Sequence, residues 1–167
     1  MAVDSTARMA TYLTFTLGDE QYAVDVTKAR EVLEITSITK VPRTPAFMRG
    51  VINLRGSVVP VCDMKTKFGM GETGRTVDSR VVVMEIVYGG ENAVVGVLAD
   101  SVQEVIELDA GQIEPPPKIG MSIDTEFIRG MGKRNDDFII ILDIDRVFSP
   151  EDMAHMEEAA QAAPAGE

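Results

Sequence analysis

The side chains most often used in catalysis are sparse in this sequence. The chain has one histidine, His155, and one cysteine, Cys62. A zinc site or a nucleophile–histidine pair cannot be assembled from so few groups. His155 lies in a polar stretch, and we expect it to be solvated on the surface. Cys62 ends an apolar run and is expected to be a small buried residue. These residues predict neither a metal site nor a cofactor.

Two other patterns are compatible with chemistry. Carboxylates lie close together at Asp136-Asp137 and at Asp143 and Asp145, but no histidine or basic partner stands at a recognisable spacing for acid–base catalysis. The segment from Gly69 to Gly74 matches G-x-G-x-x-G. A dinucleotide site needs that motif after a strand and at the start of a helix, whereas here a predicted helical turn precedes it and a predicted strand follows. We interpret it as a linker and predict a protein without enzymatic activity.

Two charged residues are better candidates for binding than for catalysis. Arg55 stands at the tip of a predicted tight hairpin, where Gly56 supplies the positive φ of the turn. An exposed arginine there either pairs with a nearby carboxylate, which contributes about 1 kcal/mol at most, or contacts a partner, because Arg is enriched in interface hot spots. The sequence leaves both interpretations open. Glu31 lies on a predicted short helix, Lys28 to Leu33, where an acid is usually solvated.

The hairpin that carries Arg55 belongs to a unit that occurs twice. The segment Phe47–Gly50 aligns without a gap with Phe127–Gly130, 80 positions later. The same register continues through two further matches, Val58–Met64 with Phe138–Ile144 and Phe68 with Phe148. Upstream, Ala29–Leu33 resembles Val102–Ile106, and short helical elements are predicted there, over Lys28 to Leu33 and Asp100 to Val105. Two copies of one β-rich unit predict that the halves superimpose.

Short apolar segments separated by Gly and Pro turns are typical of small β-barrels. We expect one barrel over about residues 20–78 and the other over 11–19 plus 79–149, and the N-terminal strand could close the second barrel. Pro60 should place its strand at an edge or a bulge. Residues 150–167 are predicted to form a C-terminal helix with a frayed tail, starting after Ser149 and ending near Gln161.

Composition narrows the class of partner. The 167 residues carry a net charge of −11 with a pI of about 4.5, which argues against nucleic-acid and anionic-membrane binding. A single cysteine excludes a disulfide within the chain and favours a reducing compartment. The first six residues lack the basic and apolar regions of a signal peptide, and no apolar run approaches the ~20 residues of a membrane span. We predict a soluble cytoplasmic protein without membrane insertion.

Four segments together resemble the CheW family of bacterial chemotaxis coupling proteins. They are Thr16–Tyr22, Thr44–Phe47, Gly50–Gly56 and Val95–Val102, and the resemblance extends from about Tyr12 to His155. It implies a mainly β fold of two five-stranded SH3-like β-barrels around a shared core. It also implies a non-enzymatic adaptor that couples the cytoplasmic tips of methyl-accepting chemoreceptors to the regulatory domain of the histidine kinase CheA, recruited to receptor arrays at the membrane.

The resemblance assigns residues to two partners by position. Those matched to kinase binding are Glu31, Leu33, Ile38 and, after the proline run, Ile119. Those matched to receptor coupling are Gly50, Arg55 and Val105, with Val102 on the same repeated element. The kinase and receptor surfaces are expected to be separate. Ala29 replaces a larger valine that is common in the family, which could make the receptor groove shallower.

Three alternatives remain open at this stage. A carboxylate enzyme would need a pocket with two acids of opposed pKa. A small-molecule-binding barrel would need a cavity in place of packed Val and Ile. A coupling module for a kinase outside chemotaxis would share the fold and differ only in its partners.

Overall fold

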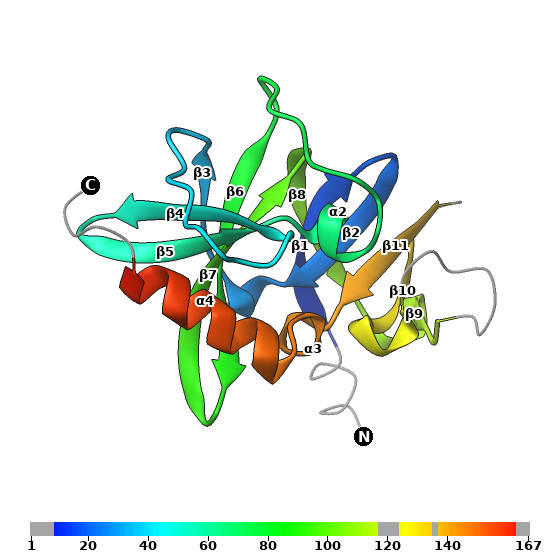
Figure 1. The fold of residues 1–167 in the computed structure, drawn as a ribbon. Helices are drawn as coiled ribbons and strands as arrows, with labels where there is room; N and C mark the ends of the chain where they lie inside the picture. Colours follow the sequence, from blue (N-terminus) through cyan, green and yellow to red (C-terminus); the bar gives the residue numbers. More distant parts are fainter. Residues whose placement is uncertain (1–8, 117–123, 135–136, 163–167) are drawn as a thin grey trace.

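Two curled β-sheets make up most of the computed structural model, which describes residues 9–116, 124–134 and 137–162 (Figure 1). We call the five-stranded sheet, with order β3-β6-β7-β5-β4, barrel 1. The six-stranded sheet, with order β8-β1-β2-β11-β10-β9, is barrel 2. Barrel 1 consists of β3 (Ala29–Glu34), β4 (Met48–Leu54), β5 (Ser57–Cys62), β6 (Arg80–Tyr88) and β7 (Glu91–Ala99). Barrel 2 consists of β1 (Ala10–Leu17), β2 (Glu20–Asp25), β8 (Ser101–Leu108), β9 (Ile113–Glu114), β10 (Ile128–Arg134) and β11 (Asp137–Leu142).

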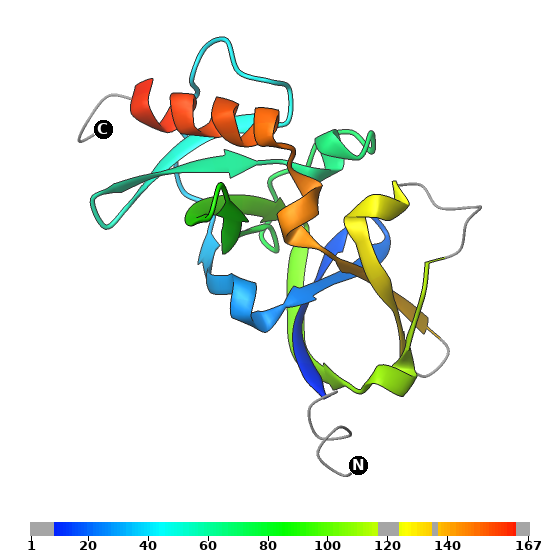
Figure 2. The same ribbon diagram turned by 90° about the horizontal axis from the view of Figure 1, so that it is seen from below.

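The mainly β fold with two barrels is confirmed, but the predicted division of the chain between them is wrong. β2 pairs with β1 and β11 in barrel 2, while β6 and β7 complete barrel 1. The chain therefore crosses between the barrels at residues 26–28 and again near residue 100 (Figure 2). Each hairpin stays together because a tight turn joins its strands. The sequence could not reveal the parallel pairs β5–β7 and β11–β2, which join strands far apart in the chain.

Both predicted short helices at the crossovers are strands. Val26–Lys28 forms a single 3₁₀ turn, η1. At its start, the Thr27 N–H donates to the Asp25 carboxylate. β3 follows at once and alternates between half-buried and exposed residues. Period-two exposure is that of a strand with one face covered, and β3 pairs with β6 from Ala29 to Glu34, with an irregularity between Ala29 and Glu31. In the same way, the segment after Asp100 pairs with β1 as strand β8.

The internal repeat is confirmed in the hairpins. β4–β5 and β10–β11 have the same register, including an irregularity between residues 48 and 50 and another between 128 and 130. The N–H of Asp63 donates to the Phe47 carbonyl at 2.7 Å, and the N–H of Asp143 donates to the Phe127 carbonyl at 2.9 Å. Pro60 is not on an edge strand, because β5 lies between β4 and β7. The ladder with β7 begins only at Val61, so the missing N–H of Pro60 removes no bond from it.

Three α-helices within the described residues cap the barrels. Asp63 caps α2 (Met64–Lys67) with its side chain, whereas Asp143 makes no such bond to α3 (Ile144–Val147). α4 (Pro150–Ala162) begins where predicted: the Asp152 N–H donates to the Ser149 hydroxyl, and the Ser149 N–H donates to the Asp152 carboxylate. α4 lies along β5 and β4 of barrel 1 (Figure 1) and buries Met153, Met156 and Ala159.

One apolar core joins both barrels and α4. It includes large buried side chains from each, among them Phe15, Tyr22, Met64, Met84, Leu142 and Met156. Cys62 is fully buried in this core with its Sγ 3.5 Å from the Met156 Sδ, as predicted for a small apolar residue. Burial raises the pKa of the Cys62 thiol. Within the residues that the structure describes, no helix has the length and apolarity needed to cross a membrane.

Candidate partner-binding surface

The tip of the β4–β5 hairpin is a two-residue turn with unusual backbone angles. Arg55 has φ of 51° and Gly56 has φ of 89°, which is the pattern of a type I′ turn. The Gly56 N–H donates to the Asn53 side-chain oxygen at 2.9 Å. Positive φ is uncommon for a residue with a side chain. The turn holds the Arg55 side chain at the tip, where 71% of it is exposed.

Arg55 forms a two-pronged ion pair with Glu31. Its Nη1 donates to Glu31 Oε1 at 3.3 Å, and its Nη2 donates to Oε2. The hydrogen bond from Arg55 holds the pKa of the Glu31 carboxyl below its usual value, with smaller contributions from the charges of Arg55 and Arg30. The ion-pair interpretation of Arg55 is therefore correct. Glu31, matched to kinase binding, and Arg55, matched to receptor coupling, are direct partners, so the structure places these two residues side by side.

Leu33 and Ile38 lie together in a half-buried apolar patch. With Ile35, Ile52 and Leu54 they pack against a buried core cluster of barrel 1, which consists of Val61, Val81, Val83 and Leu98. Leu33, Ile38, Ile52 and Leu54 also line a shallow pocket of about 410 Å³. Glu31 and Leu33 are two positions apart on β3, so their side chains lie on the same side of that strand. We call Glu31, Leu33, Ile38, Leu54 and Arg55 the hairpin surface.

Gly50 cannot offer a side chain to a partner. It is buried with φ of 142°, and a Cβ there would lie 2.2 Å from the Thr39 carbonyl oxygen and 2.9 Å from Ile38 Cγ2. Thr39 and Val51 exchange two backbone hydrogen bonds at 2.9 and 2.8 Å. Gly50 therefore lets the segment of Ile38 and Thr39 lie directly on β4.

Val102 and Val105 lie on β8 of barrel 2, away from the hairpin that carries Arg55. Val105 is 53% exposed, whereas Val102 is half-buried against the shared core. On β3, the matching exposed valine is Val32, at 40%. The structure thus does not place Val102 and Val105 on the hairpin surface. Ile119 lies outside the described residues.

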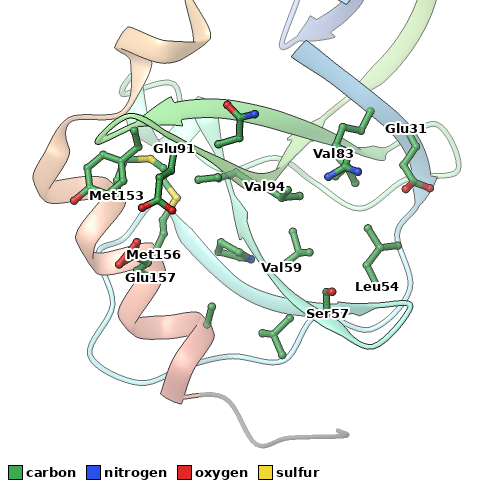
Figure 3. A pocket seen from close by; sticks show the side chains of 18 of the residues that line it. Glu31, Leu54, Ser57, Val59, Val83, Glu91, Val94, Met153, Met156 and Glu157 are labelled. Carbon is green, nitrogen blue, oxygen red and sulfur yellow. The ribbon is translucent and has the colours of Figure 1, made fainter. Parts of the chain in front are cut away.

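A groove next to the hairpin surface was missed by the sequence analysis. It has a volume of about 710 Å³ and runs between β5, the β6–β7 hairpin and α4. Figure 3 shows Val59 and Val94 along its floor, Met153 and Met156 on α4, and Glu31 and Leu54 near its far end. Met153 and Met156 are three positions apart, which places them on the same face of a helix. This spacing is the sequence signal that could have revealed the side of the groove formed by α4.

The G-x-G-x-x-G segment has a structural role. It lies between α2 and β6, as expected for a linker. Thr73 within it donates its N–H and its hydroxyl to the two oxygens of the fully buried Asp63 carboxylate, both at 2.8 Å. Arg49 donates to the same carboxylate at 2.9 Å and to the Thr73 carbonyl at 3.2 Å. The buried charge is thereby paired and fully hydrogen-bonded, which holds the segment against the base of the β4–β5 hairpin.

Within the described ranges, no group of three His, Cys, Asp or Glu side chains could hold a metal ion. His155 lies 3.9 Å from Glu151, one turn away on α4. Asp145 accepts from Lys28 and from a backbone N–H and so takes part in packing between elements. The arrangement is one of ion pairs and apolar patches, which suits recognition of other proteins.

Comparison with known proteins gives a consistent result. A family model described as the CheW-like domain matches residues 11–152. The chain is 36% identical over 151 residues to chemotaxis protein CheW of Klebsiella aerogenes, covering 90% of this chain and 89% of the relative. It is 31% identical over 140 residues to CheW of Rhizobium meliloti, covering 84% and 88%. A crystal structure of the scaffolding protein TtCheW from Thermoanaerobacter tengcongensis superimposes with a TM-score of 0.75 at 41% identity, covering 86% of this chain and 90% of that one.

Proposed function

Because the chain belongs to the family of CheW-like domains, we propose that it is a chemotaxis coupling adaptor that links a histidine kinase of the CheA type to methyl-accepting chemoreceptors. The relatives carry the names of chemotaxis proteins, and the solved structure is titled a scaffolding protein. A coupling role in another kinase pathway is not favoured by these relatives.

The hairpin surface is the proposed contact for the regulatory domain of the kinase. The observation that carries this assignment is the Glu31–Arg55 ion pair beside the apolar patch of Leu33 and Ile38. Protein interfaces typically have an apolar centre that becomes fully buried on binding and a polar rim around it. Leu33 and Ile38 suit the centre, and the Glu31–Arg55 pair suits the rim. Because Arg55 already orients Glu31 in the free protein, less side-chain entropy is lost on binding. Arg55, matched to receptor coupling, is assigned here to the same surface as Glu31.

The proposed receptor contact lies on β3 and β8. Val32 and Val105 are exposed apolar residues on these strands, one in each barrel. Exposed valines on these two strands suit the apolar side of an amphipathic helix, and the receptor tip is the proposed source of that helix. Val102 supports this contact from the core side.

We propose that the protein has no catalytic activity of its own. Burial of Cys62 and its raised thiol pKa prevent it from acting as a nucleophile. The protein would act where receptor arrays and the kinase meet, in the cytoplasm.

The test is reconstitution from purified components. We expect the protein to bind the isolated kinase regulatory domain and a receptor-tip fragment at the same time, and to make kinase activity depend on the receptor. Val105→Asp should weaken only binding of the receptor fragment, and Ile38→Asp should weaken only binding of the kinase domain. Failure of the unaltered protein to bind either partner would refute the proposal.

A further inference from the structure

The contacts between the barrels repeat in pairs, as they do in a symmetric dimer. The rings of Phe47 and Phe148 have centroids 5.9 Å apart, and those of Phe68 and Phe127 have centroids 5.8 Å apart. Phe47 corresponds to Phe127 in the repeat, and Phe68 corresponds to Phe148. Each copy therefore gives the same two positions to the other copy, which is the reciprocity of an isologous interface.

Two ion pairs are arranged similarly, with Lys65 and Asp145 at equivalent helix positions and Lys28 and Asp100 each directly before an outer strand. In the first, which we call junction 1, the Lys28 Nζ lies 2.8 Å from Asp145 Oδ2, and the Val87 N–H donates to Asp145 Oδ1 at 2.9 Å. It joins η1 at the entry to barrel 1 with α3 at the end of barrel 2. The side chains are 23% and 30% exposed, so the pair is less screened than one on the open surface.

Junction 2 is built in the same way with the charges exchanged. The Lys65 Nζ lies 3.2 Å from Asp100 Oδ2, and the Gly18 N–H donates to the same oxygen at 2.7 Å. Here the lysine is on the short helix α2, and the acid stands at the crossover before β8. The side chains are 14% and 26% exposed.

The correspondence extends to the backbone donors. Lys65 and Asp145 occupy equivalent helix positions, 80 residues apart. Val87 follows Met84, the partner of Ala29 in β3, by three residues. Gly18 follows Phe15, the partner of Val102 in β8, by the same interval. In both junctions, a carboxylate thus accepts hydrogen bonds from a lysine and from a backbone N–H at the equivalent place of the repeat.

Each junction fixes the residue that leads into an outer strand. Lys28 directly precedes β3, and Asp100 directly precedes β8. These two strands stand at the ends of their sheets and carry the exposed Val32 and Val105.

We propose that Lys28, Asp145, Lys65 and Asp100 are positioning residues that set β3 relative to β8 and thereby shape the receptor-binding surface. This inference rests on the receptor contact proposed above. Glu31 and Leu33 also lie on β3, but we expect kinase binding to be unaffected by a shift between the barrels, because these residues, Ile38 and Arg55 all move with barrel 1 and its connections.

The first experiment measures geometry without any partner. Spin labels at Val32→Cys and Val105→Cys in the full chain report the distance between β3 and β8, while the buried Cys62 remains unlabelled. We expect one narrow distance distribution in the parent and a shifted or broadened one after Asp145→Lys. The double variant Lys28→Asp/Asp145→Lys copies the charge order of junction 2 and should restore the narrow distribution. Glu158→Lys, the same charge change at an exposed site on α4, should have no effect.

The second experiment measures function by titration with a receptor-tip fragment and with the kinase regulatory domain. Asp145→Lys should weaken receptor binding about five- to tenfold, the lower range for coupling between sites, and leave kinase binding unchanged. Should Asp145→Lys not fold, Asp145→Asn keeps an acceptor for the Val87 N–H and removes only the charge. An unchanged distance distribution, no recovery in the double variant, or equal loss of both affinities would overturn the inference. Absence of receptor binding by the unaltered protein would instead overturn the proposed function, and the distances would still test the positioning role.

Discussion

Replacing Gly50 with alanine separates an indirect role of this residue from a direct one. The change forces an L residue into φ of 142° and places a Cβ 2.2 Å from the Thr39 carbonyl oxygen. The unfavourable backbone conformation costs about 1–3 kcal/mol. Displacing the segment of Ile38 and Thr39 also breaks two backbone hydrogen bonds, each contributing about 1 kcal/mol.

We therefore expect Gly50→Ala to lower the free energy of unfolding by about 3–5 kcal/mol, the range these two contributions give together. For a domain of this size, that corresponds to a melting temperature about 6–20 °C lower. Denaturant unfolding and a melting curve measure the change. Hydrogen exchange should quicken at the amides of Thr39 and Val51, which lose their partners.

Two other glycines are matched controls for Gly50→Ala. Gly56 has φ of 89° with no atom within 4 Å of a Cβ, so Gly56→Ala should show the conformational cost alone. Gly74 has neither a positive φ nor a close neighbour, so Gly74→Ala should change stability by less than about 1 kcal/mol. Kinase binding by Gly50→Ala should weaken, because Ile38 moves. A stability equal to that of Gly56→Ala, with kinase binding lost, would refute this reasoning and make Gly50 a direct contact.

Three further predictions concern the ion pair, a buried carboxylate and a buried phenol. Arg55→Ala and Glu31→Ala should each weaken binding of the kinase regulatory domain about tenfold or more, and the exchange Glu31→Arg/Arg55→Glu should recover part of that affinity. If one variant instead lost only receptor binding and the other only kinase binding, the two residues would belong to separate surfaces. Asp63→Ala should lower the free energy of unfolding by about 3–5 kcal/mol because Arg49 and Thr73 lose a buried partner. Asp143 lies 3.6 Å from the exposed Arg146, so Asp143→Ala should cost about 1 kcal/mol or less. Equal melting temperatures of these two variants would contradict a structural role for the Asp63 carboxylate. Burial raises the pKa of Tyr22 from 10.0 to about 12, so its contribution to stability is complete below pH 10 and is lost as the pH rises toward 12; stability curves of the unaltered protein and Tyr22→Phe that stay parallel above pH 10 would disprove it.

Much of the local structure follows from the sequence alone. The Arg55-Gly56 turn, the Asp63 cap and the start of α4 at Ser149 each depend on residues within a few positions of one another. The 80-residue repeat could also be found, because duplicated hairpins keep the same apolar and glycine positions. Composition and the scarcity of catalytic groups argued against nucleic-acid binding and against catalysis.

Only the tertiary structure decided which strands share a barrel and which side chains meet. The segment around Glu31 contains good helix formers, yet it is a strand because its pairing with β6 outweighs that weak local preference. The contact between Glu31 and Arg55 joins residues 24 positions apart, and those between Lys28 and Asp145 and between Lys65 and Asp100 span still longer separations. Such contacts depend on how the sheets close and on the parallel pairs β5–β7 and β11–β2, which leave no periodic signal in the chain. The hairpin surface and the two junctions are consequences of that closure.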